Sequence, residues 1–213
     1  MTQPPEETIR RVALRLLALA QSGLTYVHDP FDEERYRETA SLGAELMALM
    51  VAEPLGTLRR DLVAETGYAT PKLDVRGALF DDEGRVLLVQ ERADGLWALP
   101  GGWAEVGDSP SEAVEKEIRE ESGYGARAVK LAAVLDRDRQ GHVPALPVAI
   151  YKLLFVCEWD GEPPVTAQES ETLAVGWFPL TELPPLSLGR VLPGQLEMLA
   201  RANADRSLPA VFD

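Results

Sequence analysis

The stretch that decides the fold is Gly102–Gly123, which reads GWAEVGDSPSEAVEKEIREESG. A glycine-containing loop leads into a predicted helix that begins after Ser109 and ends at Gly123. Ser109 is a favourable N-cap, Pro110 suits the first helical position, and Glu112 completes a capping box. Gly123 can adopt the left-handed conformation that ends a helix. The sequence therefore predicts a helix that local interactions fix at both ends.

Three glutamates lie on one face of that helix. Glu117, Glu120 and Glu121 are spaced at i, i+3 and i+4, so their side chains project from the same side. A solvated acidic face is the ordinary explanation for a glutamate-rich helix. The preceding glycine loop, which lets the backbone turn tightly beside these carboxylates, favours the alternative. That alternative is a site for a hard divalent cation, which prefers oxygen ligands.

The same stretch resembles the Nudix box, the signature of the Nudix hydrolase superfamily. Its pattern is Gly-x5-Glu-x7-Arg-Glu-hydrophobic-x-Glu-Glu-x-Gly-hydrophobic, and the chain stays in register with it from Gly102 to Tyr124. The resemblance implies an α/β/α sandwich with a mixed sheet, and hydrolysis of a nucleoside diphosphate linked to another moiety X. It also implies that Glu117, Glu120 and Glu121 bind Mg²⁺, or Mn²⁺ in its place, with Glu120 also catalytic.

Two positions depart from the Nudix pattern. Asp108 stands where the family has Glu, and it keeps a carboxylate on a shorter side chain. Lys116 stands where the family has Arg, so it keeps the charge but loses the planar two-donor fork of a guanidinium. Lys116 nevertheless remains a catalytic candidate. A Nudix fold that binds nucleotide without turning it over is the alternative to an active enzyme.

Length and composition fit a globular chain that binds small molecules. The 213 residues are 46% hydrophobic, which is enough for a packed core. The net charge of −14 disfavours nucleic acid and anionic membranes as partners, because both need a basic surface. It leaves an anionic nucleotide possible when metal ions screen the site. The single cysteine, Cys157, and the absence of an apolar run of about 18 residues indicate a cytoplasmic protein without a membrane span.

The chain is expected to have two domains, a helical one over residues 1–66 and a Nudix domain over residues 71–213. Apolar periodicity predicts an N-terminal helix that ends at Ser22-Gly23, a second capped by Asp32 and extending to about Met50, and a third over about 55–65. Such short helices must bury their apolar faces against one another, on the second domain or on another subunit, and a homodimer is the favoured arrangement. The remaining predicted elements are strands near 73–79, 85–91, 128–135, 147–159 and 173–178, and a helix near 195–203.

The N-terminal segment carries a second resemblance. Residues 21–26, 29–32 and 35–36 are similar to the helical extension of a bacterial Nudix subgroup that includes CDP-choline pyrophosphatases. Asp136–Arg139 with His142, and residues 182–187 with Arg190, are also similar to that subgroup. The resemblance implies CDP-choline as a candidate substrate. An ADP-ribose or NADH-type pyrophosphatase, and a catalytically silent nucleotide sensor, are the alternatives.

Further candidate site residues lie outside the Nudix box. Glu169 and Glu171, in a late loop, are candidates for the general base or an extra metal ligand, and Glu171 is preferred. The candidates for binding the outer phosphate are Arg137, Arg139 and Lys152, and Tyr26 is a candidate for stacking on the base. For each of these residues, an ordinary surface charge or packing role is the competing explanation.

Overall fold

The computed structural model describes residues 5–51, 54–63, 65–165 and 171–213. The chain divides into two compact units. The helical unit comprises residues 1–71 and 144–149, and the sheet unit comprises residues 72–143 and 150–213. Whether 1–66 and 71–213 are the boundaries of independently folding domains stays a prediction. Within the described residues, no helix is both long enough and apolar enough to cross a membrane.

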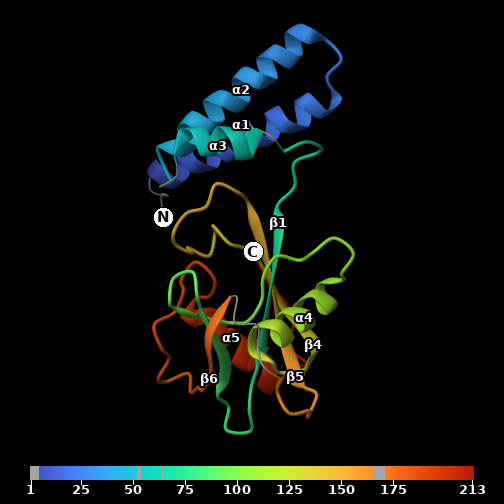
Figure 1. Ribbon diagram of the computed structural model, residues 1–213, viewed down its shortest axis with the longest axis vertical. Coiled ribbons are helices and arrows are strands. Elements are labelled where there is room, and N and C mark those ends of the chain that lie inside the picture. The colour runs from blue at the N-terminus through green and yellow to red at the C-terminus, as the bar shows by residue number, and fades with distance from the viewer. Residues whose placement is uncertain (1–4, 52–53, 64, 166–170) are drawn as a thin grey trace. The chain divides into compact units, whose positions relative to one another are not determined.

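The helical unit consists of α1 (Pro5–Tyr26), α2 (Pro30–Ala48) and α3 (Leu55–Val63), which pack against one another (Figure 1). Their shared core is small and apolar. It contains Ala13, Leu17, Ala44, Met47 and Leu58. The expectation that the helices bury an apolar stripe together is therefore met inside this unit.

Two local predictions for these helices are wrong. Gly23 does not end α1, which continues to Tyr26. A Cβ at Gly23 would collide with the ring of Tyr36, so this glycine allows α1 and α2 to approach closely. Asp32 does not cap α2 either, because Asp29 accepts hydrogen bonds from the backbone N–H groups of residues 31 and 32, at 2.8 and 3.0 Å. The proline that follows Asp29 holds it in the extended conformation that an N-cap requires.

The segment 144–149 belongs to the helical unit although it connects two strands of the sheet unit. Arg10 of α1 is almost fully buried, and its Nη1 donates to the Leu146 carbonyl oxygen at 3.0 Å. The same guanidinium forms an ion pair with Glu7 at 3.0 Å. A charge-assisted hydrogen bond of this kind is stronger than a neutral one, so it fixes the segment to α1.

The sheet unit contains seven strands and two helices among the described residues. Their bounds are β1 (Lys72–Leu79), β2 (Val86–Glu91), β3 (Trp97–Ala98), α4 (Pro110–Ser122), β4 (Ala126–Asp136), β5 (Ile150–Trp159), β6 (Thr172–Phe178), α5 (Pro193–Ala204) and β7 (Val211–Phe212). One sheet has the order β1-β5-β4-β7, with β1–β5 and β4–β7 parallel and β4–β5 antiparallel. The other has the order β3-β2-β6 and is antiparallel. The predicted mixed sheet is confirmed, whereas β3 and β7 were not predicted because two residues show no period.

The two helices of the sheet unit cover opposite faces of the strands. On β5, Leu154 and Val156 share a core with α5, whereas Phe155 and Cys157 share a core with α4. Successive side chains of a strand point to opposite faces, so this alternation places one helix on each side. The predicted α/β/α sandwich is therefore confirmed. Cys157 is buried in β5, and burial raises the pKa of its thiol to about 12.

The caps of α4 agree with the sequence prediction. The Ser109 hydroxyl accepts from the Glu112 backbone N–H at 3.3 Å, and the Glu112 carboxylate accepts from the Ser109 N–H at 2.9 Å. Gly123 ends the helix with a φ of 77°. Residues 113, 114 and 118 face the sheet. The acidic face of α4 therefore starts from a helix whose position is fixed by caps and by packing.

Candidate active site

The glycine loop that precedes α4 lies along the free edge of β1. Backbone hydrogen bonds join Gly77 N to Pro100 O at 3.0 Å and Val75 N to Gly102 O at 2.9 Å. Gly101 has a φ of 142°, and a Cβ there would collide with the Val75 carbonyl oxygen. Only glycine fits this position, because it has both the left-handed backbone and the close approach. The loop is thus held against β1 by its own backbone.

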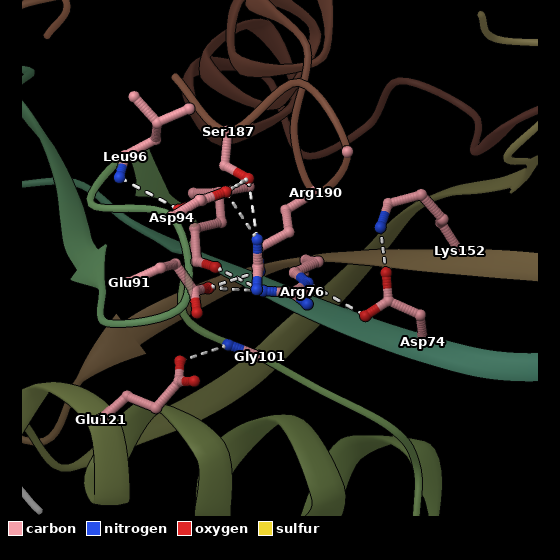
Figure 2. Close-up of polar contacts among 12 residues, drawn as sticks. Asp74, Arg76, Glu91, Asp94, Leu96, Gly101, Glu121, Lys152, Ser187 and Arg190 are labelled. Carbon is pink, nitrogen blue, oxygen red and sulfur yellow. Dashed lines mark hydrogen bonds and ion pairs between the residues drawn. The ribbon is translucent and has the colours of Figure 1, made fainter. Parts of the chain in front are cut away.

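Glu121 is the buried member of the acidic face. Its Oε2 accepts a hydrogen bond from the Gly101 backbone N–H at 2.8 Å, and the residue is 6% exposed (Figure 2). Burial raises the pKa of this carboxyl to about 8, although the nearby Arg76 guanidinium and the Gly101 N–H both favour the ionised form. The carboxylate is therefore fixed in place and only partly compensated in charge.

Glu117 and Glu120 are half-buried on the same helix. Burial also raises the pKa of Glu117, and Arg76 is again the largest charge that opposes this effect. A Cβ at Gly102 would lie 2.8 Å from Glu117 Oε1, so a side chain at residue 102 would crowd this carboxylate. The loop and the helix therefore meet at two acidic side chains, Glu117 and Glu121.

The chemistry of this donor set fits a hard divalent cation. Carboxylate oxygens are the ligands that Mg²⁺ and Mn²⁺ prefer, and all three glutamates project from one helix. Across the described part of the chain, no three His, Cys, Asp or Glu side chains are gathered closely enough to hold a metal ion. In this structure Glu121 is instead bound to Gly101 N. The assignment of the three glutamates as ligands therefore stays a prediction.

Lys116 lies on α4 but points to the preceding loop. Its Nζ is 2.7 Å from Glu105 Oε2 and 3.8 Å from Asp108 Oδ2. The two positions that depart from the Nudix pattern, 108 and 116, are thus neighbours in space. Both partners of Lys116 are largely in solvent, so the pair is a surface interaction of small stabilising effect.

A chain of ion pairs, buried from Lys152 to Glu91 and more open at Arg190 and Asp94, adjoins the glycine loop (Figure 2). Arg76 Nε donates to Asp74 Oδ1 at 3.0 Å, and Asp74 also binds the ammonium of Lys152. The chain continues through Arg76 Nη1 and Glu91 Oε1 at 3.7 Å, and through Glu91 Oε1 and Arg190 Nε at 2.9 Å. It ends at Asp94, which accepts from the Arg190 guanidinium at 2.9 Å and from the Ser187 hydroxyl at 2.7 Å.

Sequence reasoning missed most of this chain of ion pairs. Asp74 and Arg76 are charged residues inside a strand whose residues 74–79 are all buried. A charge within a strand that is buried on both faces must be paired, which is the signal that was available. Its partners could not be assigned, because Glu91 and Arg190 are distant in sequence.

The structure separates the three predicted phosphate-binding residues. Lys152 is 1% exposed, and burial lowers the pKa of its ammonium to about 8 against the effect of Asp74. Arg137 is 2% exposed, and its Nε donates to the Gly189 carbonyl at 3.3 Å. Arg139 is exposed and lies 3.7 Å from Asp136. Of the three, Arg139 is therefore the one open to solvent.

The remaining predicted residues lie elsewhere. Glu171 is exposed just before β6, and its backbone carbonyl accepts from Arg92 N at 2.8 Å. Glu169 lies outside the described residues. Tyr26 is exposed at the end of α1, in the helical unit. The functional roles of these residues stay predictions.

The family models match both parts of the chain. Residues 70–201 match the NUDIX domain, and residues 7–61 match the UDP-X-like, N-terminal oligomerisation domain. The chain therefore belongs to the Nudix family, and it is an enzyme of the pyrophosphohydrolase class that acts on acid anhydrides. Divalent metal ions are the general cofactors of this family.

Two similar proteins extend over nearly the whole chain, and a third covers about two thirds of it. "Putative ADP-ribose pyrophosphatase YjhB" of Bacillus subtilis is 44% identical over 94% of this chain and 95% of its own length. The crystal structure of a UDP-X diphosphatase is 32% identical, has a TM-score of 0.60, and covers 98% of this chain and 99% of its own. The crystal structure of an ADP-ribose pyrophosphatase from Streptococcus suis is 38% identical with a TM-score of 0.60, over 68% of this chain and 100% of its own.

Proposed function

We propose that this protein is an Mg²⁺-dependent hydrolase that cleaves the pyrophosphate linkage of a nucleoside diphosphate joined to a moiety X. The observation that carries the proposal is the pairing of Glu121 with the Gly101 N–H, with Glu117 and Glu120 on the same helix face. This arrangement places carboxylate oxygens at a loop that backbone hydrogen bonds hold against β1. Mn²⁺ is the alternative ion, since it takes the same oxygen ligands.

The chain's own residues supply ligands and position in this proposal. Glu117, Glu120 and Glu121 would hold the ion, which when bound neutralises phosphate charge and lowers the pKa of bound water. Glu171 is exposed and is our candidate for the base that accepts a proton from the attacking water. Arg139 is the exposed cation available to an outer phosphate, whereas Arg137 and Lys152 are buried. Lys116 would hold the loop before α4 through Glu105 and Asp108.

Three kinds of nucleotide are the candidate substrates, and they differ both in the base and in the X group. The Bacillus and Streptococcus relatives are named for ADP-ribose, and the UDP-X diphosphatase is named for uridine nucleotides. The motifs at residues 21–36 and 136–142 favour CDP-choline by resemblance. All three compounds share the linkage that the site would cleave, and Tyr26 is retained as a candidate for contact with the base. We further propose that the helical unit forms a homodimer and that the protein acts in the cytoplasm, on a small nucleotide and not on nucleic acid.

The test is a turnover assay on the full chain with ADP-ribose, CDP-choline, UDP-glucose and NADH. Each compound is incubated with Mg²⁺, with Mn²⁺ and with a chelator, and nucleoside monophosphate release is measured by chromatography. We expect metal-dependent release from at least one compound, and the ranking identifies the X group. Binding of a compound in calorimetry without release under any metal condition would favour the nucleotide-sensing alternative instead.

A further inference from the structure

We propose that Arg76 is the positioning residue of this site, because from β1 it holds the glycine loop that in turn holds Glu121. The inference rests on the proposed function and names a residue outside the Nudix box. Arg76 Nη1 donates to the Leu99 carbonyl oxygen at 3.0 Å, two residues before the Gly101 N–H that binds Glu121. The loop is therefore gripped on one side by a guanidinium and on the other by a carboxylate.

The glycine loop is also held against β1 by its own backbone. Its backbone is bonded to β1 on both sides of Gly101, and a Cβ added at Gly101 would lie only 2.9 Å from Arg76 Cα and 3.0 Å from Arg76 Cδ. Figure 2 draws Gly101 between the helix that carries Glu121 and the side chain of Arg76. The backbone of Gly101 therefore runs close to Arg76, and a shift of Arg76 should disturb the position of the Gly101 amide.

Arg76 is itself held rigidly. It is 6% exposed, and its guanidinium contacts the carboxylates of Asp74 and Glu91 at 3.0 and 3.7 Å. Asp74 is shared with Lys152, and Glu91 is shared with Arg190. A planar guanidinium can satisfy Asp74 and the Leu99 carbonyl at the same time, which a single ammonium cannot do in the same geometry. The ion pairs thus preorganise Arg76 for the loop.

Arg76 and Lys116 carry positive charges that are bound at different places. Lys116 is bound to Glu105 and lies near Asp108, on the loop before α4. Arg76 is instead buried on β1, and it donates to the Leu99 carbonyl of the glycine loop.

The decisive variant is Arg76→Lys, with Arg190→Lys as the matched control. Both changes remove a guanidinium from the same chain of ion pairs and keep the charge, but only Arg76 contacts the glycine loop. Hydrogen exchange of the Gly101 amide is followed by NMR in the metal-free full chain, Mg²⁺ alone is titrated by calorimetry, and kcat and KM are measured on the best substrate of the panel.

We expect Arg76→Lys to accelerate Gly101 exchange and weaken Mg²⁺ binding, each by about tenfold or more, as outer-shell changes do at metal sites. Its kcat should fall by a similar factor with little change in KM, because position and not substrate affinity is lost. Arg190→Lys should leave Gly101 exchange near the wild-type rate. Wild-type Gly101 exchange and wild-type kcat in Arg76→Lys would overturn the inference, as would an equal effect of Arg190→Lys.

A second variant covers a failure of Arg76→Lys to fold. Arg76→Met removes the donor to the Leu99 carbonyl and leaves both carboxylates paired, because Asp74 keeps the ammonium of Lys152 and Glu91 keeps the guanidinium of Arg190. Slow Gly101 exchange in this variant would also overturn the inference. If the wild-type protein hydrolyses none of the panel, the proposed function fails, while Gly101 exchange and Mg²⁺ binding still decide the role of Arg76.

Discussion

Helices α2 and α4 begin with the same cap pattern, but the residues on their buried faces differ in chemistry. Each has a short polar N-cap followed by proline, Asp29-Pro30 in α2 and Ser109-Pro110 in α4. The face that α2 buries carries small or apolar residues, namely Ala40, Gly43, Ala44 and Met47. The face that α4 buries includes the carboxylate of Glu121. Local signals therefore determine where a helix begins, whereas the residues on its buried face determine whether it serves packing or a functional site.

The two buried faces respond to different variables. A buried carboxylate is unfavourable unless it is protonated, bound to a cation or hydrogen-bonded. The stability and activity of the α4 region should therefore depend on pH and on metal ions. Small residues allow close packing between helices. The stability and assembly of the α2 region should therefore depend on packing contacts and on protein concentration. Four changes test this contrast, with expected effects on turnover, stability and assembly that decrease from the first to the last.

The largest effect should come from removing one negative charge from the acidic face. Glu120→Gln or Glu121→Gln should lower turnover by more than about 100-fold, because an amide cannot supply the anionic oxygen that fixes Mg²⁺. Circular dichroism should show an unchanged fold. Glu197→Gln, an exposed change of the same kind on α5, is the control and should keep wild-type turnover. Wild-type rates in both α4 variants would remove the functional side of the contrast.

The next effect concerns the pH dependence of stability in metal-free protein. The pKa of Glu121 is raised from 4.5 to about 8 in the folded state. Between these values the folded state keeps a proton that the unfolded state releases, so the free energy of unfolding falls as pH rises from about 5 to about 8. Calorimetry in chelator should show the melting temperature falling by several degrees over this window, and by less in Glu121→Gln.

Metal ions supply the control for that measurement. Millimolar Mg²⁺ should raise the melting temperature of the wild type at pH 8, since an ion that binds only the folded state stabilises it. Glu121→Gln should show a smaller rise. Equal pH dependence in the two proteins, together with no response to Mg²⁺, would mean that the buried carboxylate has no special role.

A smaller effect is expected on assembly through the helical unit. Leu19 of α1 is 62% exposed, and this unit matches a family described as an oligomerisation domain. If the proposed homodimer forms, Leu19→Glu should shift it towards monomer in light scattering, because the change places a charge on an apolar surface. Glu34→Gln, which changes an exposed residue of α2, should leave the dimer intact. A wild-type protein that is monomeric at high concentration would contradict the proposed homodimer.

The smallest effect should come from Lys116, which lies at the exposed start of the α4 face. Its ion pair with Glu105 is solvated, so Lys116→Ala should change the free energy of unfolding by less than about 1 kcal/mol. Lys116→Arg should keep turnover, and Lys116→Ala should lower it by less than either glutamate variant. Steady-state rates and chemical denaturation measure the two quantities. A loss in Lys116→Ala as large as that in Glu121→Gln would place Lys116 among the essential groups.

The sequence was most informative where structure is set by neighbours along the chain. The capping box and the glycine stop predicted α4, and the Nudix spacing predicted the family and the fold. The sequence pattern predicted the cap of α2 at Asp32, although Asp29-Pro30 has the same form as Ser109-Pro110, because no adjacent motif identified Asp29 as a cap. Gly23 was read as a stop, although the ring of Tyr36 explains it. That contact joins two helices and leaves no local signal.

The candidate site divides in the same way. The three glutamates were predicted from their spacing on one helix, and their roles await the tests above. The chain of ion pairs through Arg76 joins β1, the end of β2 and the loop before α5, which lie far apart in sequence. Periodicity cannot reveal partners such as Glu91 and Arg190, since these pairs depend on how the segments that carry them come together. The burial of Arg137 and Lys152 has the same origin.

The assignment of residues 144–149 to the helical unit affects how this unit can be exchanged between proteins, in evolution or by engineering. The chain leaves the helical unit after residue 71, re-enters it at 144 and leaves again after 149. The helical unit is therefore not a cassette that one cut can remove or that a gene fusion can transfer. A truncation at residue 66 would strand the segment that Arg10 binds, and a graft of residues 1–71 onto another Nudix domain would lack it. Exchange between relatives should succeed only when the β4–β5 connection travels with the N-terminal helices.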